Sequence, residues 1–219
     1  MRRQVDALVF DLGGVLIDVS FARAIEAWAA LAGVPVGEIT PRFRTDEVFH
    51  AHERGQISDA QYFAAMRDML GIALDDADFL SGWNAVIGEP IAGMEALLRG
   101  LSDVVPLYVF SNTNAAHTAH WKPRHRELLA PIREVICSCE IGCRKPDAEA
   151  FLRVSRLAGL PASRIAFFDD SEQNVVGARA VGMRAFRVSC AEHVRQALPD
   201  LGVDVGKSDT DRPPVGRGT

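Results

Sequence analysis

The segment Ala7–Leu16, read ALVFDLGGVL, decides the fold, because four apolar residues run directly into a single acid, Asp11. A short apolar run followed closely by glycines is typical of a buried strand that ends in a turn. An acid at the end of such a strand is a candidate nucleophile. The position two residues further on, where a second acid would assist the first, is Gly13. The segment therefore raises the question of what does the work of the missing acid.

Four more strands are predicted, each from a short run rich in β-branched or aromatic residues: Pro106–Phe110, Glu134–Cys139, Arg164–Phe168 and Arg184–Val188. Helical segments alternate with these runs, which predicts the α/β class with a doubly wound, Rossmann-like parallel sheet. Ligands of such sheets bind beyond the carboxyl ends of the strands. Polar clusters follow four of the predicted strands: Asp11, Ser111–Asn114, Cys143–Asp147 and Asp169–Ser171. We expect the functional site at this edge of the sheet.

The long segment between the first two predicted strands contains no strand-like run. It is predicted to form four helices, near Phe21–Ala32, Glu38–His50, Asp59–Leu70 and Asp75–Val86. Ser58 and Gln61 form a capping box at the start of the third helix. A helical insert at this place suggests a lid over the site, joined by linkers near Asp18–Ser20 and Gly88–Pro90. The predicted division is a core of residues 1–18 and 89–203, a helical cap of residues 19–88, and a disordered tail of residues 204–219.

Composition excludes several classes of protein. The chain has 219 residues, of which 48% are hydrophobic and 24% charged, an ordinary globular balance. A formal net charge of −5 argues against a nucleic-acid partner. No apolar run is long enough to cross a bilayer and no leader is recognisable, so we expect no membrane association and a cytoplasmic location.

Three of the four cysteines, Cys137, Cys139 and Cys143, stand close together. Their spacing is not the paired spacing of a structural zinc site, and no histidine follows at a ligand distance in the chain. We expect reduced thiols without a chemical role, with a redox or metal function as the alternative. The oligomeric state is left open by the sequence.

The polar clusters together contain a carboxylate nucleophile, a hydroxyl with neighbouring backbone donors, a cation and a pair of carboxylates. Phosphoryl transfer through an aspartyl phosphate needs these groups, because an oxygen attacks, donors bind the phosphate oxygens and a hard cation holds the two negative groups together. Mg²⁺ suits a site made of oxygen ligands. Three of the four clusters also have a plainer structural interpretation: a capped turn at Asp11, a polar turn at Ser111 and a solvated loop at Lys145.

FDLGGVL, VFSNTN, RKPD and FFDDSEQN resemble, in order, the four motifs of the haloacid dehalogenase superfamily. The resemblance extends to about residue 200, and the helical insert resembles the C1 cap of that superfamily. HERGQISD, SNTNxxHTxxW and RKP more closely resemble bacterial enzymes that hydrolyse α-glucose 1-phosphate. The chain is also similar to the phosphatase domain joined to some epoxide hydrolases.

This resemblance implies roles for individual residues. Asp11 would be the nucleophile, and Lys145 would pair with both the nucleophile and the phosphate. Phosphate would also be bound by Ser111 and by the backbone N–H of Asn112. The ligands of Mg²⁺ would be Asp11, the Gly13 carbonyl, Asp169 and Asp170. Asn174, four residues after Asp170, would position a water or a metal ligand.

Two residues of the cap, His52 and Glu53, are candidates for contact with substrate or water, with packing at a helix end as the alternative. His117 and Trp121 lie one helical turn apart, and we expect both to pack a helix on the sheet.

We predict a Mg²⁺-dependent hydrolase of a small phosphorylated metabolite, with a sugar 1-phosphate preferred. An anomeric hydroxyl is more acidic than other sugar hydroxyls, so it leaves more easily when Gly13 replaces the usual acid. A dehalogenase is the alternative on the same fold, although a mechanism without metal has little use for the Asp169–Asp170 pair. A phospholigand-binding protein with weak catalysis is the alternative from another class, and Gly13 favours it.

Overall fold

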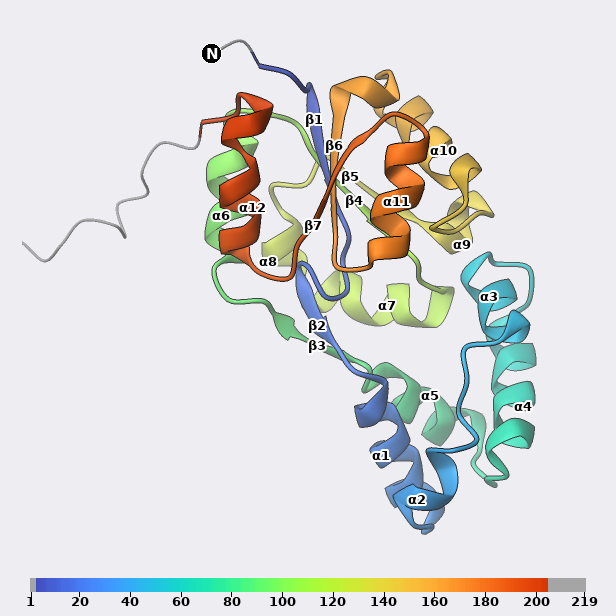
Figure 1. The fold of residues 1–219 in the computed structure, drawn as a ribbon. Helices are drawn as coiled ribbons and strands as arrows, with labels where there is room; N and C mark the ends of the chain where they lie inside the picture. The colour runs from blue at the N-terminus through green and yellow to red at the C-terminus, as the bar shows by residue number, and fades with distance from the viewer. Residues whose placement is uncertain (1–2, 205–219) are drawn as a thin grey trace, which may run out of the picture.

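The computed structural model describes residues 3–204 and contains a five-stranded parallel sheet in the order β5-β4-β1-β6-β7. The strands are β1 (Ala7–Phe10), β4 (Leu107–Ser111), β5 (Glu134–Cys137), β6 (Ile165–Asp169) and β7 (Arg184–Arg187). The predicted fold class is confirmed, and each strand lies within two residues of its predicted bounds. Because β1 occupies the centre, Asp11 emerges in the middle of the carboxyl edge (Figure 1). The predicted tail lies outside the described residues except for Asp204.

Alternate residues of the central strands enter two separate hydrophobic cores. Leu8 and Phe10 of β1 belong to one core, whereas Ala7 and Val9 belong to the other. Successive side chains of a strand point to opposite faces, and a parallel sheet is covered on both. All four side chains are fully buried, which explains why β1 is a continuous apolar run rather than an alternating one.

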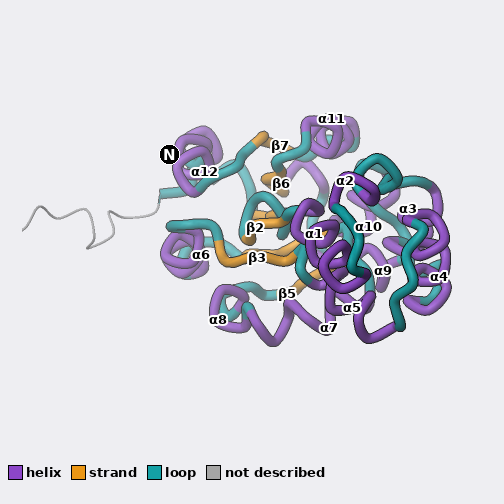
Figure 2. Tube along the Cα trace, turned by 90° about the horizontal axis from the view of Figure 1, so that it is seen from below, coloured by secondary structure: helices purple, strands orange, loops and turns teal. Residues whose placement is uncertain are grey.

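Helices cover both faces of the sheet. They are α6 (Met94–Ser102), α7 (Ala115–Arg124), α8 (Arg126–Leu129), α9 (Ser138–Ile141), α10 (Ala148–Ala158), α11 (Glu172–Ala180) and α12 (Ala191–Ala197), with 3-10 turns at Ala162–Arg164 and Pro199–Leu201. Helices α6 and α12 lie on one face and α10 and α11 on the other (Figures 1 and 2). Between residues 3 and 204 no helix has both the length and the apolar character needed to span a membrane.

The helical insert begins and ends in a strand. Strands β2 (Ile17–Val19) and β3 (Ile87–Pro90) pair antiparallel, with Ile17 opposite Pro90. The prediction that the segment between the first two core strands contains no strand is therefore wrong at its two ends. Strand β2 has only three residues, and β3 contains a glycine and a proline that disfavour strand structure, so pairing with each other is what forms them. The helices between them are α1 (Phe21–Ala32), α2 (Val36–Ile39), α3 (Glu47–Glu53), α4 (Asp59–Leu70) and α5 (Asp76–Asn84).

We propose that these five helices, within residues 19–88, form a cap over the carboxyl ends of the core strands. They lie on the side of the molecule at which those strands end (Figure 1). The capping box at α4 is present, with Ser58 Oγ accepting from the Gln61 N–H and Gln61 Oε1 accepting from the Ser58 N–H. Trp28 of α1 stacks on Phe79 of α5 at 4.6 Å between ring centroids, which joins the first and last cap helices.

The single helix predicted over Glu38–His50 is wrong. The chain instead forms α2 and α3, separated by a loop of residues 40–46. Pro41 has no N–H to donate and its ring obstructs a continuous helix, so α2 ends before it. Asp46 then starts a new helix, because its carboxylate accepts from the N–H groups of Val48 and Phe49.

Candidate active site

Lys145 and Asp11 meet at the carboxyl ends of the central strands. The Lys145 ammonium lies 2.8 Å from Asp11 Oδ1 and 2.8 Å from Asp169 Oδ2, and it donates to the Phe110 carbonyl at 3.0 Å. Its three hydrogens thus have three acceptors, which satisfies a side chain that is only 1% exposed. The plainer interpretation of Lys145 as a solvated loop residue is excluded.

Burial and neighbouring charges together set the pKa values of Asp11 and Lys145. Burial raises the pKa of Asp11 well above its usual value, and the Asp169 and Asp170 carboxylates add to that rise while Lys145 opposes it. For Lys145, burial alone would lower the pKa, but the carboxylates of Asp11 and Asp169 outweigh burial and raise it. The ammonium therefore stays charged, and the three carboxylates concentrate negative charge that a cation would neutralise.

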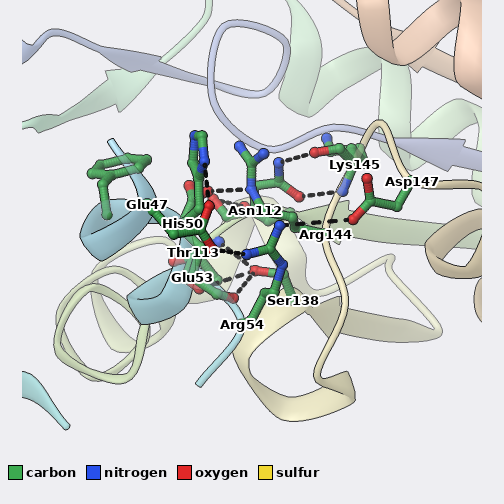
Figure 3. Close-up of polar contacts among 12 residues, drawn as sticks. Glu47, His50, Glu53, Arg54, Asn112, Thr113, Ser138, Arg144, Lys145 and Asp147 are labelled. Atoms are coloured by element: carbon green, nitrogen blue, oxygen red, sulfur yellow. Dashed lines mark hydrogen bonds and ion pairs between the residues drawn. The ribbon is translucent and has the colours of Figure 1, made fainter. Parts of the chain in front are cut away.

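The side chain of Asn112 holds the backbone of Lys145. Asn112 Nδ2 donates to the Lys145 carbonyl at 2.9 Å, and Asn112 Oδ1 accepts from the Lys145 N–H at 2.9 Å (Figure 3). This double hydrogen bond ties the end of β4 to the lysine loop. Because the amide side chain is occupied, the backbone N–H is the group that Asn112 can offer a ligand. Ser111, just before it, is also buried.

The two adjacent acids at the end of β6, Asp169 within the strand and Asp170 just after it, have different surroundings. Asp169 is fully buried and accepts from the Ser171 N–H at 2.9 Å, from Asn174 Nδ2 at 2.9 and 3.1 Å, and from Lys145. Protein donors thus occupy both of its oxygens. Asp170 is exposed, and burial and the neighbouring Asp169 raise its pKa. Asn174 orients Asp169, and Asp170 is the acid with room for a ligand.

The carboxylates of Asp11, Asp169 and Asp170 each offer an oxygen within 4.8 Å of the others, which fits a hard divalent cation. Gly14 contributes to this arrangement, because it has φ +75° and a Cβ there would collide with the Asp170 carboxylate. We propose that Asp11, Asp170 and the Gly13 carbonyl would hold Mg²⁺. Asp169 lies beside them, but its oxygens already accept hydrogen bonds from Lys145, Ser171 and Asn174.

A cavity of about 200 Å³ opens above these residues, between the core and the cap. Among its lining residues are Phe21, Phe49, Glu53 and Trp83 from the cap, and Asp11, Gly13, Ser111, Asn112, His117, Trp121, Lys145, Asp170 and Asn174 from the core. Its wall is therefore aromatic on the cap side and polar on the core side.

The two cap candidates, His52 and Glu53, differ in whether they line the cavity. His52 is 2% exposed, hydrogen-bonds Asp59 Oδ1 through Nε2 at 2.7 Å and stacks on Tyr62, and it does not line the cavity. Its ring joins α3 to α4, which favours the alternative of packing at a helix end over contact with substrate or water. Glu53 lines the cavity and accepts from Arg144 Nε at 2.7 Å (Figure 3).

His117, expected only to pack a helix on the sheet, also lines the cavity and contacts the cap. Its Nε2 donates to the Trp83 carbonyl at 3.0 Å and its ring stacks on Trp83, so it joins core helix α7 to cap helix α5. Burial lowers the pKa of His117 to about 4, which keeps the ring neutral. The available signal was Asn114, whose carboxamide caps α7 by accepting from the His117 N–H at 2.9 Å.

Replacing Lys145 by methionine is expected to destabilise the fold by about 3–5 kcal/mol, because two buried carboxylates lose their cation. Urea unfolding in the presence of EDTA would measure this loss. Lys122→Met is the matched control, since Lys122 pairs with Glu140 at the surface and its loss should cost less than about 1 kcal/mol. Equal stability of the two variants would contradict the coupling described here.

Two of the proteins that are similar in sequence are phosphatases. The chain is 22% identical over 196 residues to a D-ribitol-5-phosphate phosphatase of Bacteroides thetaiotaomicron, covering 87% of this chain and 95% of the relative. It is 29% identical over 208 residues to a phosphatase of Mycobacterium tuberculosis, covering 89% of this chain and 92% of the relative.

Solved structures show the same fold. A haloacid dehalogenase family enzyme of Bacteroides thetaiotaomicron, crystallised with magnesium and inorganic phosphate, has a TM-score of 0.72 at 27% identity, covering 85% of this chain and 96% of that one. The L-2-haloacid dehalogenase of Xanthobacter autotrophicus has a TM-score of 0.61 at 21% identity, covering 90% of this chain and 83% of that one. A family model for the haloacid dehalogenase-like hydrolases matches residues 5–182, so the chain belongs to this hydrolase family.

Proposed function

We propose that this protein hydrolyses a small phosphomonoester through an aspartyl-phosphate intermediate. The observation that carries the proposal is the contact of Asp11 with the buried Lys145, beside an acid, Asp170, that has room for a cation. Two phosphatases among the similar proteins, and a similar structure holding magnesium and phosphate, support it. The cytoplasmic location remains a prediction, and the four free thiols agree with it.

The first half of the reaction transfers the phosphoryl group to the protein. Asp11 forms a bond to phosphorus while the bond from phosphorus to the leaving oxygen breaks. The Leu12 N–H and Lys145 both contact Asp11 Oδ1, at 2.6 and 2.8 Å, and fix the carboxylate for attack. Ser111 and the Asn112 N–H would bind phosphate oxygens. When bound, Mg²⁺ would supply positive charge between nucleophile and phosphate.

We further propose a sugar 1-phosphate as the substrate, because the site has no acid at Gly13. A Cβ on Gly13 would lie 3.1 and 3.2 Å from the two methyl groups of Val19, so the side chain of Val19 crowds the space beside this position. Without an acid here, the leaving group must depart with more negative charge. An anomeric oxygen tolerates this charge better than an ordinary sugar hydroxyl does. The aromatic cap wall also suits the apolar face of a sugar ring.

The rate is expected to depend steeply on the acidity of the leaving group. General acid catalysis contributes typically about 10²–10⁴-fold, and a site without the acid cannot compensate for a poor leaving group. A series of substituted aryl phosphates, assayed with Mg²⁺, would measure the slope. A hexose 1-phosphate should also be hydrolysed faster than the same hexose 6-phosphate. A flat aryl series would show that another group protonates the leaving oxygen.

The same assay distinguishes the alternatives. A phospholigand-binding protein would bind inorganic phosphate without releasing it from any aryl phosphate. A dehalogenase would release halide from a 2-haloacid instead, and the exposed Asp170 beside Asp11 argues against that metal-free mechanism. Turnover of haloacids without turnover of phosphates would overturn the proposed function.

A further inference from the structure

The second half of the proposed reaction needs a base, which Gly13 cannot supply. A water must attack the aspartyl phosphate, and proton removal from that water is a task typical of a carboxylate or a histidine. Within residues 3–204, five titratable side chains line the cavity: Asp11, Glu53, His117, Lys145 and Asp170. The base is expected among them, and Asp11 carries the phosphoryl group at this stage.

Three of the remaining four are already engaged. Lys145 has three acceptors for its three hydrogens. His117 donates from Nε2 to the Trp83 carbonyl, and its Nδ1 lies 3.2 Å from Asn114 Nδ2, so neither ring nitrogen is free to take a proton. Asp170 belongs to the proposed cation site. Glu53 is therefore the candidate base that remains among the titratable residues lining the cavity.

Contacts with the core hold Glu53 in place. Its Oε2 accepts from Arg144 Nε at 2.7 Å, and its backbone carbonyl accepts from Ser138 Oγ at 2.6 Å (Figure 3). In the described part of the chain no hydrogen bond is found at Oε1. The carboxylate is therefore anchored through one oxygen, and the other is available in the cavity.

The position of Glu53 suits the direction of attack. In a phosphoryl transfer the attacking and leaving oxygens are roughly in line with phosphorus, so the water arrives on the face opposite Asp11. Asp11 belongs to the core edge of the cavity, and α3 contributes Phe49 and Glu53 to its cap wall. Glu53 thus lies on the side from which the water comes.

The surroundings also suit a base. Burial raises the pKa of Glu53, while the neighbouring Arg144 opposes the rise. A carboxylate of raised pKa accepts a proton more readily than a surface carboxylate does. The ion pair with Arg144 keeps the group charged before the water arrives.

We propose that Glu53 is the general base of the dephosphorylation step, an inference that rests on the proposed function. The water oxygen forms a bond to phosphorus while the bond from phosphorus to the Asp11 oxygen breaks. One water proton passes to Glu53 Oε1. Asp11 is released as a carboxylate, inorganic phosphate leaves, and Glu53 returns its proton to solvent.

The test is pre-steady-state hydrolysis of 4-nitrophenyl phosphate by Glu53→Gln in the presence of Mg²⁺. Glutamine keeps an oxygen for Arg144 but cannot take the proton. We expect one nitrophenol per active site in a burst, followed by turnover about 10²–10⁴-fold slower than wild type. Acid-quenched protein should carry hydroxylamine-sensitive acyl phosphate. The value of kcat/KM should stay within about threefold of wild type, because it reports the steps through phosphorylation.

Two further variants separate a catalytic role from a structural one. Glu47→Gln makes the same change on the same helix at an exposed residue and should leave kcat unchanged. Glu53→Asp keeps the carboxylate and should restore part of kcat, and it also replaces the glutamine variant if that variant does not fold.

The outcomes are distinct. If Glu53→Gln shows no burst and its kcat and kcat/KM fall together, the inference is overturned while the proposed function stays intact. A kcat of Glu53→Gln within about threefold of wild type has the same meaning. A wild-type protein without turnover overturns the proposed function and this inference with it.

Discussion

Asp11→Asn is expected to lower phosphatase turnover by about 10⁴-fold or more, because it removes the proposed nucleophile. Asparagine keeps the shape of the side chain and an oxygen for the Leu12 N–H and Lys145, but it lacks the charged oxygen that attacks phosphorus. Release of phosphate from an aryl phosphate, measured at saturating substrate, checks the loss.

The variant should still bind inorganic phosphate, because the proposed phosphate donors, Ser111 and the Asn112 N–H, remain. Titration calorimetry would measure this binding. Asp18→Asn is the matched control, since Asp18 is an exposed acid paired with Arg23 and should leave turnover unchanged. Turnover of Asp11→Asn within about tenfold of wild type would show that another group is the nucleophile.

Removal of divalent metal is expected to abolish activity, and addition of Mg²⁺ should restore it. Without a cation, the carboxylates of Asp11 and Asp170 repel both each other and the incoming phosphate. An assay in excess EDTA, followed by titration with MgCl₂, measures this dependence.

A second readout of the metal does not depend on activity. Mg²⁺ that binds the folded state stabilises it, by about 2.7 kcal/mol at a hundred times the Kd. Thermal unfolding should therefore shift upward with Mg²⁺ in wild type and much less in Asp170→Asn. Full activity in EDTA, or equal shifts in the two proteins, would contradict the metal site.

The sequence predicts the core well because the core obeys local rules. The three central strands, β4, β1 and β6, are nearly continuous apolar runs, as burial on both faces requires. The site residues lie at the ends of those strands or directly after them, so locating a strand also locates its polar end. This rule predicts Asp11, Ser111 and Asp169, and the structure brings them to one edge of the sheet.

The cap was predicted less accurately because its details depend on tertiary contacts. Strands β2 and β3 form only by pairing with each other. His52 and Glu53 are adjacent in the sequence, yet one packs on Tyr62 and the other lines the cavity. Which of the two faces the cavity depends on how α3 packs on the core, and that packing depends on Ser138 and Arg144, far away in the chain.

The central position of β1 has a consequence for how the protein folds. This strand comes first in the chain, but its neighbours are β4 and β6, so that Leu8 pairs with both Leu107 and Ala166. Contacts between residues so distant in sequence form slowly, because a long loop must close before the contact can stabilise it. During synthesis β1 therefore stays unpaired until β4 and β6 have been made. Until then its backbone edges are open to pairing with other chains. Asp11 meets Asp169 only at that stage, so a shortened or newly made chain lacks the complete site.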